Sequence, residues 1–486
     1  MMRQINLTGG SYDARAVAVA AQRVLNLYAE PVPPDDGEPV SYAYYPTPGL
    51  IRRALLSGTI RCLYQTTQGD LIAACQSGVY LVGRSGGTTL IGQISITASV
   101  IRISDNGTTL FVVDGNSGRG WYCSMPSKPG QGNYGPLSEM SGSEWYGSPT
   151  IALLDTFFIF VNPNTTNWYT SPAQFSDETS TPFDSLYVAS DTTSLSTIIA
   201  AAVVGQYIWL FGRYQTEFWY DSGASDFPFQ RVQGVTVEAG CISPWTIATI
   251  PTTGVTPNGG IMWLGRDRSG YARVYMGQQT TAVPVSTFPV DGALQDMGDL
   301  SGAVASTYQQ DGHVFYVLTV PGQSSSWAYD VSAGLWHERC ALDAAGNEAQ
   351  IRPYCYAEAY GKVWAGDYEN GAIYEVSMSA GDDAGMPIKR QRSFPHLLTN
   401  GQRGIHRQLM LNMQCGGGQT VAIDWSDDRG ATFAGAQRVT LGTTGNTWPS
   451  IWRLGLARDR VYRLTWTDPG ITALMGVFLQ VDQVRT

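Results

Sequence analysis

A unit of three strands recurs seven times along the chain, and this repeat constrains the fold more than any other feature. Each unit has an apolar strand, a Gly or Asp turn, a second strand, and an aromatic strand that ends in another polar turn. The third strands are predicted to start near Val79, Leu110, Trp168, Glu217, Val274, Trp327 and Ile373. Their spacings of 31, 58, 49, 57, 53 and 46 residues centre on the roughly 40–50 residues of a four-stranded propeller blade.

Antiparallel sheets in series leave open edges and one unburied face each, and a radial arrangement around an axis solves both problems. The repeat therefore predicts an all-β chain with a β-propeller of about seven blades, within a range of six to eight. A set of separate β-sandwiches is the alternative that the pattern leaves open.

The segment WAYDVSAGLWHER, residues 327–339, places two tryptophans around a tight turn. A catalytic loop is one interpretation, because acids, a histidine and an arginine stand together. A structural hairpin is the other, with Trp327, Tyr329 and Trp336 packed between blades. Asp330 would then bond turn amides and Gly334 would adopt positive φ. We predict the hairpin.

Composition supports a mostly β protein with a large core, since 43% of the residues are hydrophobic, only 14% are charged, and 55 are glycine. No apolar run reaches the length that spans a bilayer, and the start MMRQINLTGG lacks the features of a signal peptide. We therefore expect no membrane partner and assembly in the cytoplasm. The seven cysteines include no C-x-x-C pair and are expected to be free buried thiols.

Charge is unevenly distributed and predicts three parts. Residues 388–486 hold 12 Lys+Arg against 6 Asp+Glu, a net +6, whereas residues 1–387 hold 18 against 34, a net −16. Such a step marks a domain boundary, and the strand pattern after it is typical of a β-sandwich. We predict an N-terminal arm and connector (1–50), a propeller (51–387) and a basic C-terminal β-sandwich (388–486).

The arm differs from the repeats in its composition. AVAVAAQRVLNLYAE, residues 16–30, is compatible with a short helix, and PVPPDDGEP, residues 31–39, reads as a Pro-rich acidic connector. The arm is expected to dock away from the propeller.

Candidate chemistry is sparse. Gly83–Gly87, GRSGG, matches a nucleophile elbow, but the elbow needs a strand that runs into a helix, and a strand-like segment follows here. His313, His337, His396 and His406 have no metal-binding spacing. The acidic pairs stand in turns and give little support for a glycosidase dyad. No catalytic residue, cofactor or metal is predicted.

The segment SDDRGATF fits the Asp-box pattern, which stabilises a hairpin in sialidases and other propellers. Its structural residues are Ser426, Asp428, Gly430, Thr432 and Phe433. A sialidase carries several such boxes inside its propeller. A single copy in the predicted C-terminal domain favours a structural turn.

The order of several segments resembles the tail-hub or nozzle proteins of short-tailed bacteriophages, also called packaged DNA stabilisation proteins. The segments are RVLNLYAE (23–30), YYPTPGL (44–50), QYIWLFGRYQTEFWYDSG (206–223), IMWLGRDRSGYARVYMGQQTTAVPVST (261–287), WAYDVSAGLWHER, and the ending with SDDRGATF and RLGLARDRVYRLTWT (453–467). The resemblance covers more than 400 residues and contains no catalytic fingerprint.

The resemblance implies a structural virion protein. A ring of six copies would lie below the head-tail adaptor, form the lower tail, and seal packaged DNA in the head. Tailspikes or fibres and a needle-like plug would attach to it. Double-stranded DNA would pass through the lumen without specific binding, because an acidic body repels the duplex.

Two groups of residues are predicted at interfaces with partners. They are Arg23, Asn26 and Tyr28 in the arm, and Arg453, Arg458, Arg460 and Arg463 in the basic domain; a solvated strand face is the alternative for the arginines. Two other functions stay open: a carbohydrate-binding or sialidase-like propeller, and a peripheral receptor-binding module. A propeller alone does not separate the three.

Overall fold

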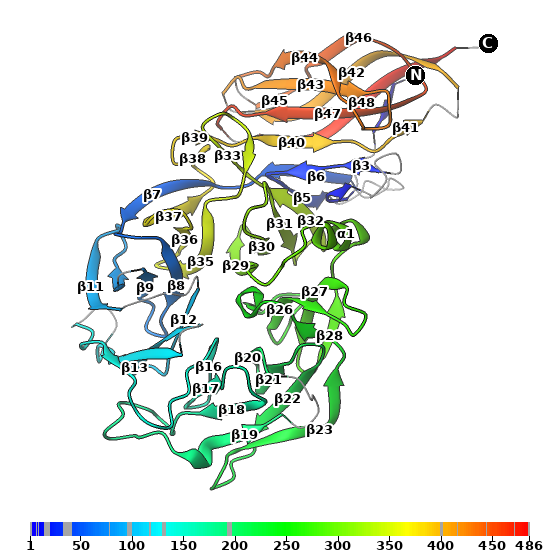
Figure 1. Cartoon of the computed structure of the whole chain (residues 1–486). Coiled ribbons are helices and arrows are strands. Elements are labelled where there is room, and N and C mark those ends of the chain that lie inside the picture. The colour runs from blue at the N-terminus through cyan, green and yellow to red at the C-terminus, as the bar shows by residue number, and fades with distance from the viewer. Residues whose placement is uncertain are drawn as a thin grey trace.

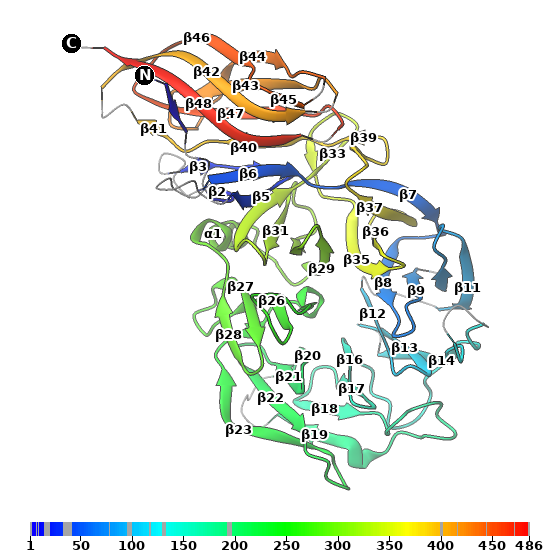
Figure 2. The ribbon, with the colours of Figure 1, turned by 180° about the vertical axis from the view of Figure 1, so that it is seen from behind.

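A computed structural model describes residues 2–5, 7, 9–13, 20–32, 41–76, 78–94, 100–115, 118–128, 133–191, 197–398, 402–415, 417–443, 445–470 and 472–484. Seven antiparallel sheets follow one another around an axis and form one body of the molecule (Figures 1 and 2). A layered β-structure at the C-terminal end lies against one side of this ring. The predicted all-β fold with a β-propeller is confirmed.

Each blade is a sheet in which consecutive strands pair as neighbours. The first four blades are β8–β11 (Ile60–Gln65, Leu71–Cys75, Gly78–Val82, Thr88–Gln93), β12–β15 (Ile101–Asp105, Thr109–Asp114, Arg119–Ser124, Ser138–Glu139), β16–β19 (Ile151–Leu154, Phe157–Val161, Asn167–Thr170, Val188–Ser190) and β20–β23 (Ala200–Val204, Tyr207–Phe211, Thr216–Asp221, Phe229–Val237). Blade five contains β24–β28 (Gly240–Cys241, Ala248–Ile250, Gly260–Arg266, Ala272–Gln278, Thr281–Pro284) and blade six β29–β32 (Val304–Gln310, His313–Thr319, Ser326–Asp330, Leu335–Arg339).

The helical turns lie within blades three and five and at the edge between blades five and six. They are the 3-10 turns Ser185–Tyr187 and Pro244–Thr246 and the α-helix α1 (Phe288–Asp296).

Blade seven closes the ring with strands from both ends of the propeller sequence. It contains β35–β37 (Pro353–Ala359, Lys362–Asp367, Ala372–Ser377), and its fourth strand is β7 (Gly49–Leu55). β7 pairs antiparallel with β37, with Leu50 opposite Val376. The short hairpin β38–β39 (Asp382–Asp383, Met386–Pro387) continues this sheet on the far side of β7.

Six of the seven predicted third strands hold the third place in their blades. The exception is the segment at Leu110, which lies in the second strand β13. The third strand of that blade is β14, which carries Trp121 and Tyr122. The predicted position falls on the more apolar of two adjacent strands. β13 is strongly apolar because every one of its residues is buried.

The innermost strands of the blades surround an axial cavity of about 390 Å³. Trp245, in the 3-10 turn of blade five, packs with Val100 and Val304 at the end of the axis where β12 and β29 begin. Arg102 of blade two donates from Nη2 to the Trp245 carbonyl at 2.9 Å, and its guanidinium lies over the indole at 5.9 Å. Trp245 thus joins blade five to blades two and six across the axis.

The C-terminal strands form a sandwich of two sheets, as predicted. One sheet has the order β45-β42-β48-β6-β5 (Gly445–Thr447, Gly404–Cys415, Ala473–Gln483, Ser41–Pro46, Leu27–Val32), with β1 (Met2–Gln4) on β48 and β46 (Ser450–Ala457) on β42. The other has the order β4-β40-β47-β43-β44 (Val24–Leu25, Arg390–Ser393, Asp459–Trp466, Thr420–Ser426, Ala434–Thr440), with β41 (Leu397–Leu398) on β47. Leu409, Ile423 and Leu464 lie in the core between the sheets.

The N-terminal residues are strands in both bodies, so the short helix expected over 16–30 is wrong for the described residues 20–30. Apolar residues there pair with distant strands, and tertiary pairing outweighs weak helix propensity. β4 pairs with β32 of blade six, Leu25 opposite Glu338, and with β40 of the sandwich, Leu25 opposite Gln391. One sheet therefore runs from blade six through the arm into the sandwich, and the expectation that the arm docks away from the propeller is wrong. Residues 33–40, most of the predicted connector, lie outside the described residues.

Smaller two-stranded sheets flank this junction. They are β2–β3 (Tyr12–Asp13, Ala21–Gln22) and β33–β34 (Ala341–Leu342, Glu348–Ala349).

The segment 327–339 forms the predicted hairpin. Asp330 Oδ1 accepts from the amides of Ser332 and Ala333 at 2.9 and 3.1 Å, and Gly334 has φ +69°. Trp327, Tyr329 and Trp336 pack in the core between blades five and six. The catalytic-loop interpretation is not needed to explain these residues.

Two further predictions from the sequence concern the turn at Gly83–Gly87 and the cysteines. The turn connects the strands β10 and β11, so the strand-to-helix elbow is absent there. None of the seven cysteines forms a disulfide bond, and all seven are buried. Among the described residues, no helix is long and apolar enough to cross a membrane.

Candidate functional site

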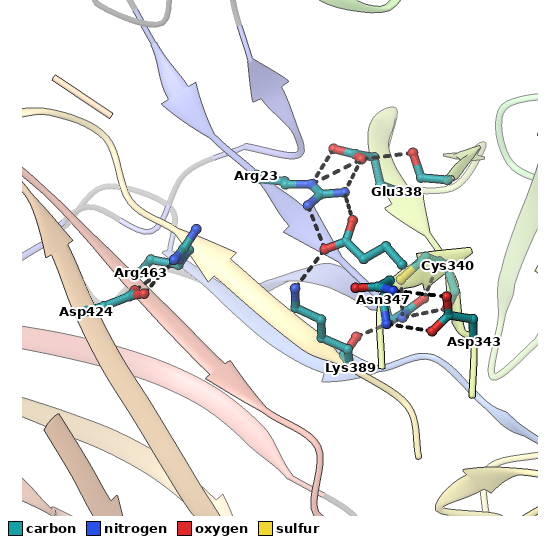
Figure 3. Close-up of polar contacts among 11 residues, drawn as sticks. Arg23, Glu338, Cys340, Asp343, Asn347, Lys389, Asp424 and Arg463 are labelled. Carbon is teal, nitrogen blue, oxygen red and sulfur yellow. Dashed lines mark hydrogen bonds and ion pairs between the residues drawn. The ribbon is translucent and has the colours of Figure 1, made fainter. Parts of the chain in front are cut away.

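The junction between blade six, the arm and the sandwich contains a network of charged side chains (Figure 3). Arg23, between β3 and β4, contacts Glu338 of β32 at 2.7 Å and Glu348 of β34 at 2.8 Å. Lys389, which precedes β40, contacts Glu348 at 2.7 Å. One guanidinium thus joins two propeller carboxylates, and a lysine at the sandwich shares one of them.

The electrostatics of this network favour its charged state. Burial alone would raise the pKa of the Glu348 carboxyl, but hydrogen bonds from Arg23 and Lys389 lower it to about 2. Burial likewise opposes the charge of Arg23, and the two glutamates outweigh it and raise its pKa. The network is therefore ionised at neutral pH and acts as a fixed structural contact.

Asn26 connects three backbone segments at the same place. Its Nδ2 donates to the carbonyls of Cys340 and Lys389 at 2.9 and 2.8 Å, and its Oδ1 accepts from the Cys340 amide at 3.1 Å. Its φ is +51°, a conformation that Asn adopts more readily than most residues. Asn26 is only 3% exposed.

Tyr28, in β5, packs in the core of blade six. Its ring lies 5.5 Å from Phe315 and 5.1 Å from His313. Burial raises the pKa of its phenol. All three predicted arm residues thus make these contacts within one chain. The contacts hold the arm between the propeller and the sandwich.

The four C-terminal arginines separate into two pairs. Arg460 is buried and makes two hydrogen bonds to Asp427, at 2.6 and 2.7 Å. Arg463 contacts Asp424 (Figure 3) and lies 3.9 Å from the Phe433 ring centre. Arg453 and Arg458 are exposed, and Arg453 has φ +62°. Arg453 and Arg458 are thus the more exposed of the two pairs.

The Asp-box segment forms a hydrogen-bonded turn between β43 and β44. Ser426 Oγ donates to Asp428 at 2.6 Å and accepts from the Gly430 amide at 2.7 Å. Asp428 also accepts from the amide and hydroxyl of Thr432 at 2.9 and 2.6 Å. The hydrogen bond from Ser426, followed by those from Thr432, lowers the pKa of Asp428 to about 2. Phe433 is half-buried beneath Arg463.

The histidines lie apart, each beside a different polar group. His313 contacts Asp330 at 2.6 Å, His396 contacts Asp459 at 2.9 Å, and His406 contacts the Tyr462 hydroxyl at 2.9 Å. His337 accepts from Arg339 Nε at 3.1 Å. Across the described ranges, no group of three His, Cys, Asp or Glu residues is placed to hold a metal ion.

The sequence did not single out Glu338, Glu348 or Lys389, although they complete the junction. Glu338 was visible as the acid in the WHER segment, an unusual charge in an aromatic strand. Glu348 and Lys389 gave no such signal, because each stands in an ordinary polar context and meets Arg23 only through tertiary folding.

Comparison with known proteins gives one family. The family model described as "Bacteriophage P22 Gp10, beta-propeller" matches residues 3–381. Residues 382–486, which include the Asp-box turn, lie beyond the matched segment. No curated protein matches the chain.

The solved structures that match the chain are distant. The extracellular domain of the one-component system BT4673 from B. thetaiotaomicron is 10% identical with a TM-score of 0.39, and the match covers 81% of this chain and 47% of that one. An exo-β-1,3-galactanase from Phanerochaete chrysosporium is 9% identical with a TM-score of 0.30, covering 85% and 100%. The designed protein Ika8 is 9% identical with a TM-score of 0.35, covering 73% and 99%.

The family match extends over most of the chain, from the arm through all seven blades. It includes the residues of the junction on the arm and propeller side, Arg23, Glu338 and Glu348. The chain belongs to the phage family described as Bacteriophage P22 Gp10, β-propeller, and is a structural protein of a phage tail.

Proposed function

We propose that copies of this chain form a ring in the lower tail of a short-tailed phage, below the head-tail adaptor, and close the exit of packaged DNA. Six copies are the proposed number. The main support for this proposal is the family match over residues 3–381. An assembly role is also consistent with the way the arm, propeller and sandwich share one sheet, because the shared sheet fixes their relative positions.

The charge distribution supports a lumen through which DNA slides. Residues 1–387 carry a net −16, and a field of this sign repels phosphate over roughly 8–10 Å in ordinary salt. Double-stranded DNA would then pass without specific binding.

The proposed partners attach to other surfaces of the ring. They are the head-tail adaptor, tailspikes or fibres, and a needle-like plug. The exposed Arg453 and Arg458 suit an acidic surface of a neighbouring copy or of the adaptor. Arg460 and Arg463 already have carboxylate partners within the chain, so they support the sandwich itself.

The test uses the parent phage with a stop codon at Trp121, which ends the chain in blade two. We expect particles that fill with DNA, then lose it, and show a shortened tail in negative stain. A plasmid copy of the full chain is the control and should restore both DNA content and tail length. Full particles that only fail to attach to cells would instead make the protein a receptor-binding module. Tails of full length that cleave host glycans less well would favour the carbohydrate-active alternative.

A further inference from the structure

Large apolar side chains lie on the solvent face of the sandwich sheet that contains β46, β42 and β48, beside the ion pair of Arg407 and Asp482. Side chains alternate along these strands, so Ile451, Leu409 and Leu479 point into the core. The opposite face carries Trp452 and Leu456 on β46, Ile405 and Met410 on β42, and Phe478 on β48. The pairing register places Leu456 opposite Ile405, and Met410 opposite Phe478. We call these five residues together with Trp448 the outer face.

The exposure of the outer face is unusual for a soluble surface. Trp452 is 56% exposed, Trp448 48%, Leu456 45% and Ile405 38%. The Trp448 ring lies 5.5 Å from the Phe478 ring, so the apolar surface continues from one strand to the next. A contiguous apolar and aromatic surface of this kind marks a site of protein association.

The backbone of β46 presents this surface outward. Arg453 has φ +62° and Gly455 φ +84°, and the pairing of β46 with β42 shifts register between His406 and Gln408. This irregularity leaves two consecutive residues, Trp452 and Arg453, both exposed. A non-glycine residue held at positive φ costs free energy, and such positions cluster at functional sites.

The charge around the outer face indicates what covers it. Arg403, Arg453 and Arg458 are exposed in the same domain, and residues 388–486 carry a net +6. The remainder of the chain carries a net −16. In a second copy of the chain, residues 1–387 therefore have a net charge of opposite sign to this domain.

We propose that the outer face binds the acidic propeller part of a neighbouring copy. This inference rests on the proposed ring, and it names the surface by which one copy holds the next. The sandwich and the propeller are different surfaces of the chain, so the contact is head-to-tail. Repeated head-to-tail contacts close into a ring when the rotation between copies allows it.

The test places a photo-crosslinking benzophenone amino acid at position 452 of the full chain and supplies this chain to the stop-codon phage. After irradiation of purified particles, we expect a crosslinked product of twice the chain mass. Its peptides should join position 452 to residues 51–387. A crosslink to another virion protein, a crosslink within one chain, or no crosslink in particles that contain the protein would each overturn the inference. If the unmodified chain, supplied in the same way, is absent from the tails, the proposed function itself fails.

A matched pair of substitutions checks the same surface without a crosslinker. Leu456→Glu places a charge on the outer face, and Leu398→Glu places the same charge on β41 of the other sandwich sheet, where Leu398 is 57% exposed. Both variants should fold with the far-ultraviolet circular dichroism of the parent chain. Leu456→Glu should enter tails at least about tenfold less than the parent, because a charge buried in an apolar contact weakens association. Equal incorporation of Leu456→Glu and Leu398→Glu would contradict the proposal.

Discussion

At the residue scale, single polar groups hold the arm in place, and Asn26 is the clearest example. Its side-chain hydrogen bonds connect three backbone segments at a place where no strand pairing connects them. Removing it leaves buried backbone donors and acceptors of Cys340 and Lys389 without partners. An unsatisfied buried group costs more than the hydrogen bond it lost.

We predict that Asn26→Gly lowers the free energy of unfolding by about 2–4 kcal/mol. Asn26→Ala should cost more, because alanine is strained at φ +51° whereas glycine is not. Urea denaturation measures both. Asn258→Ala, at an exposed position of the β25–β26 loop, is the control and should change the value by less than about 0.5 kcal/mol. An Asn26→Gly variant as stable as the parent would show that the junction does not depend on this side chain.

Asp383 gives the junction a pH dependence. It lies near Arg390 and Arg352, yet burial outweighs them and raises its pKa to about 7. The folded chain therefore binds a proton that the unfolded chain releases near its usual pKa of 3.8. Stability contributed by this group is present at low pH and is lost as pH rises toward 7.

The expected result is that Asp383→Asn stabilises the protein at pH 8, by about 1–2 kcal/mol, and changes it little at pH 4. Thermal unfolding across this pH range gives the comparison. Asp382→Asn, the adjacent acid in the same short strand β38, is the matched control. Parallel pH curves for the parent and Asp383→Asn would refute the assignment.

The C-terminal arginines show why residue roles are hard to predict from sequence. Arg458 and Arg460 stand two residues apart, yet one is exposed and the other is buried. The difference in burial comes from Asp427, which lies in the turn between β43 and β44 and pairs with Arg460. An ionic partner 33 positions away leaves no mark in the local pattern.

At the scale of elements, the blades were predictable and the strands that join them were not. Each blade is local, with a turn pattern that repeats along the chain. β7 instead pairs with β37 more than 300 residues later, and β4 pairs with both β32 and β40. Such pairings depend on the closed ring, and the short apolar segments that make them resemble a helix in isolation.

Like these strands, Trp245 connects separate blades, because it reaches across the propeller axis from blade five. A methyl group on Gly115 would lie 2.0 Å from the indole Cη2 atom, so the two residues are sterically coupled. Trp245→Ala should cost about 3–5 kcal/mol of unfolding free energy through the cavity it leaves. Gly115→Ala should also destabilise the parent chain.

In the Trp245→Ala background, the additional cost of Gly115→Ala should disappear, since the clash is gone. A double-mutant cycle by chemical denaturation measures this coupling. Additive effects of the two substitutions would mean that Trp245 does not pack against blade two.

At the scale of the whole molecule, the N-terminal segment closes the propeller and connects it to the sandwich. β5 and β6 lie in one sandwich sheet, β4 lies in the other, and β7 completes blade seven. The propeller and the sandwich are therefore held in one orientation by residues that precede both of them in sequence. A fixed orientation suits a chain that must repeat identical contacts around a ring.

The most direct test of the ring account is whether the purified chain restores DNA retention. Extract from cells infected with the Trp121 stop-codon phage is supplied with the purified full chain, and DNA protected from nuclease inside particles is measured with tail length. We predict that protection and tail length rise together to the level of the wild-type phage. Tails that regain their length while the heads still lose their DNA would contradict it.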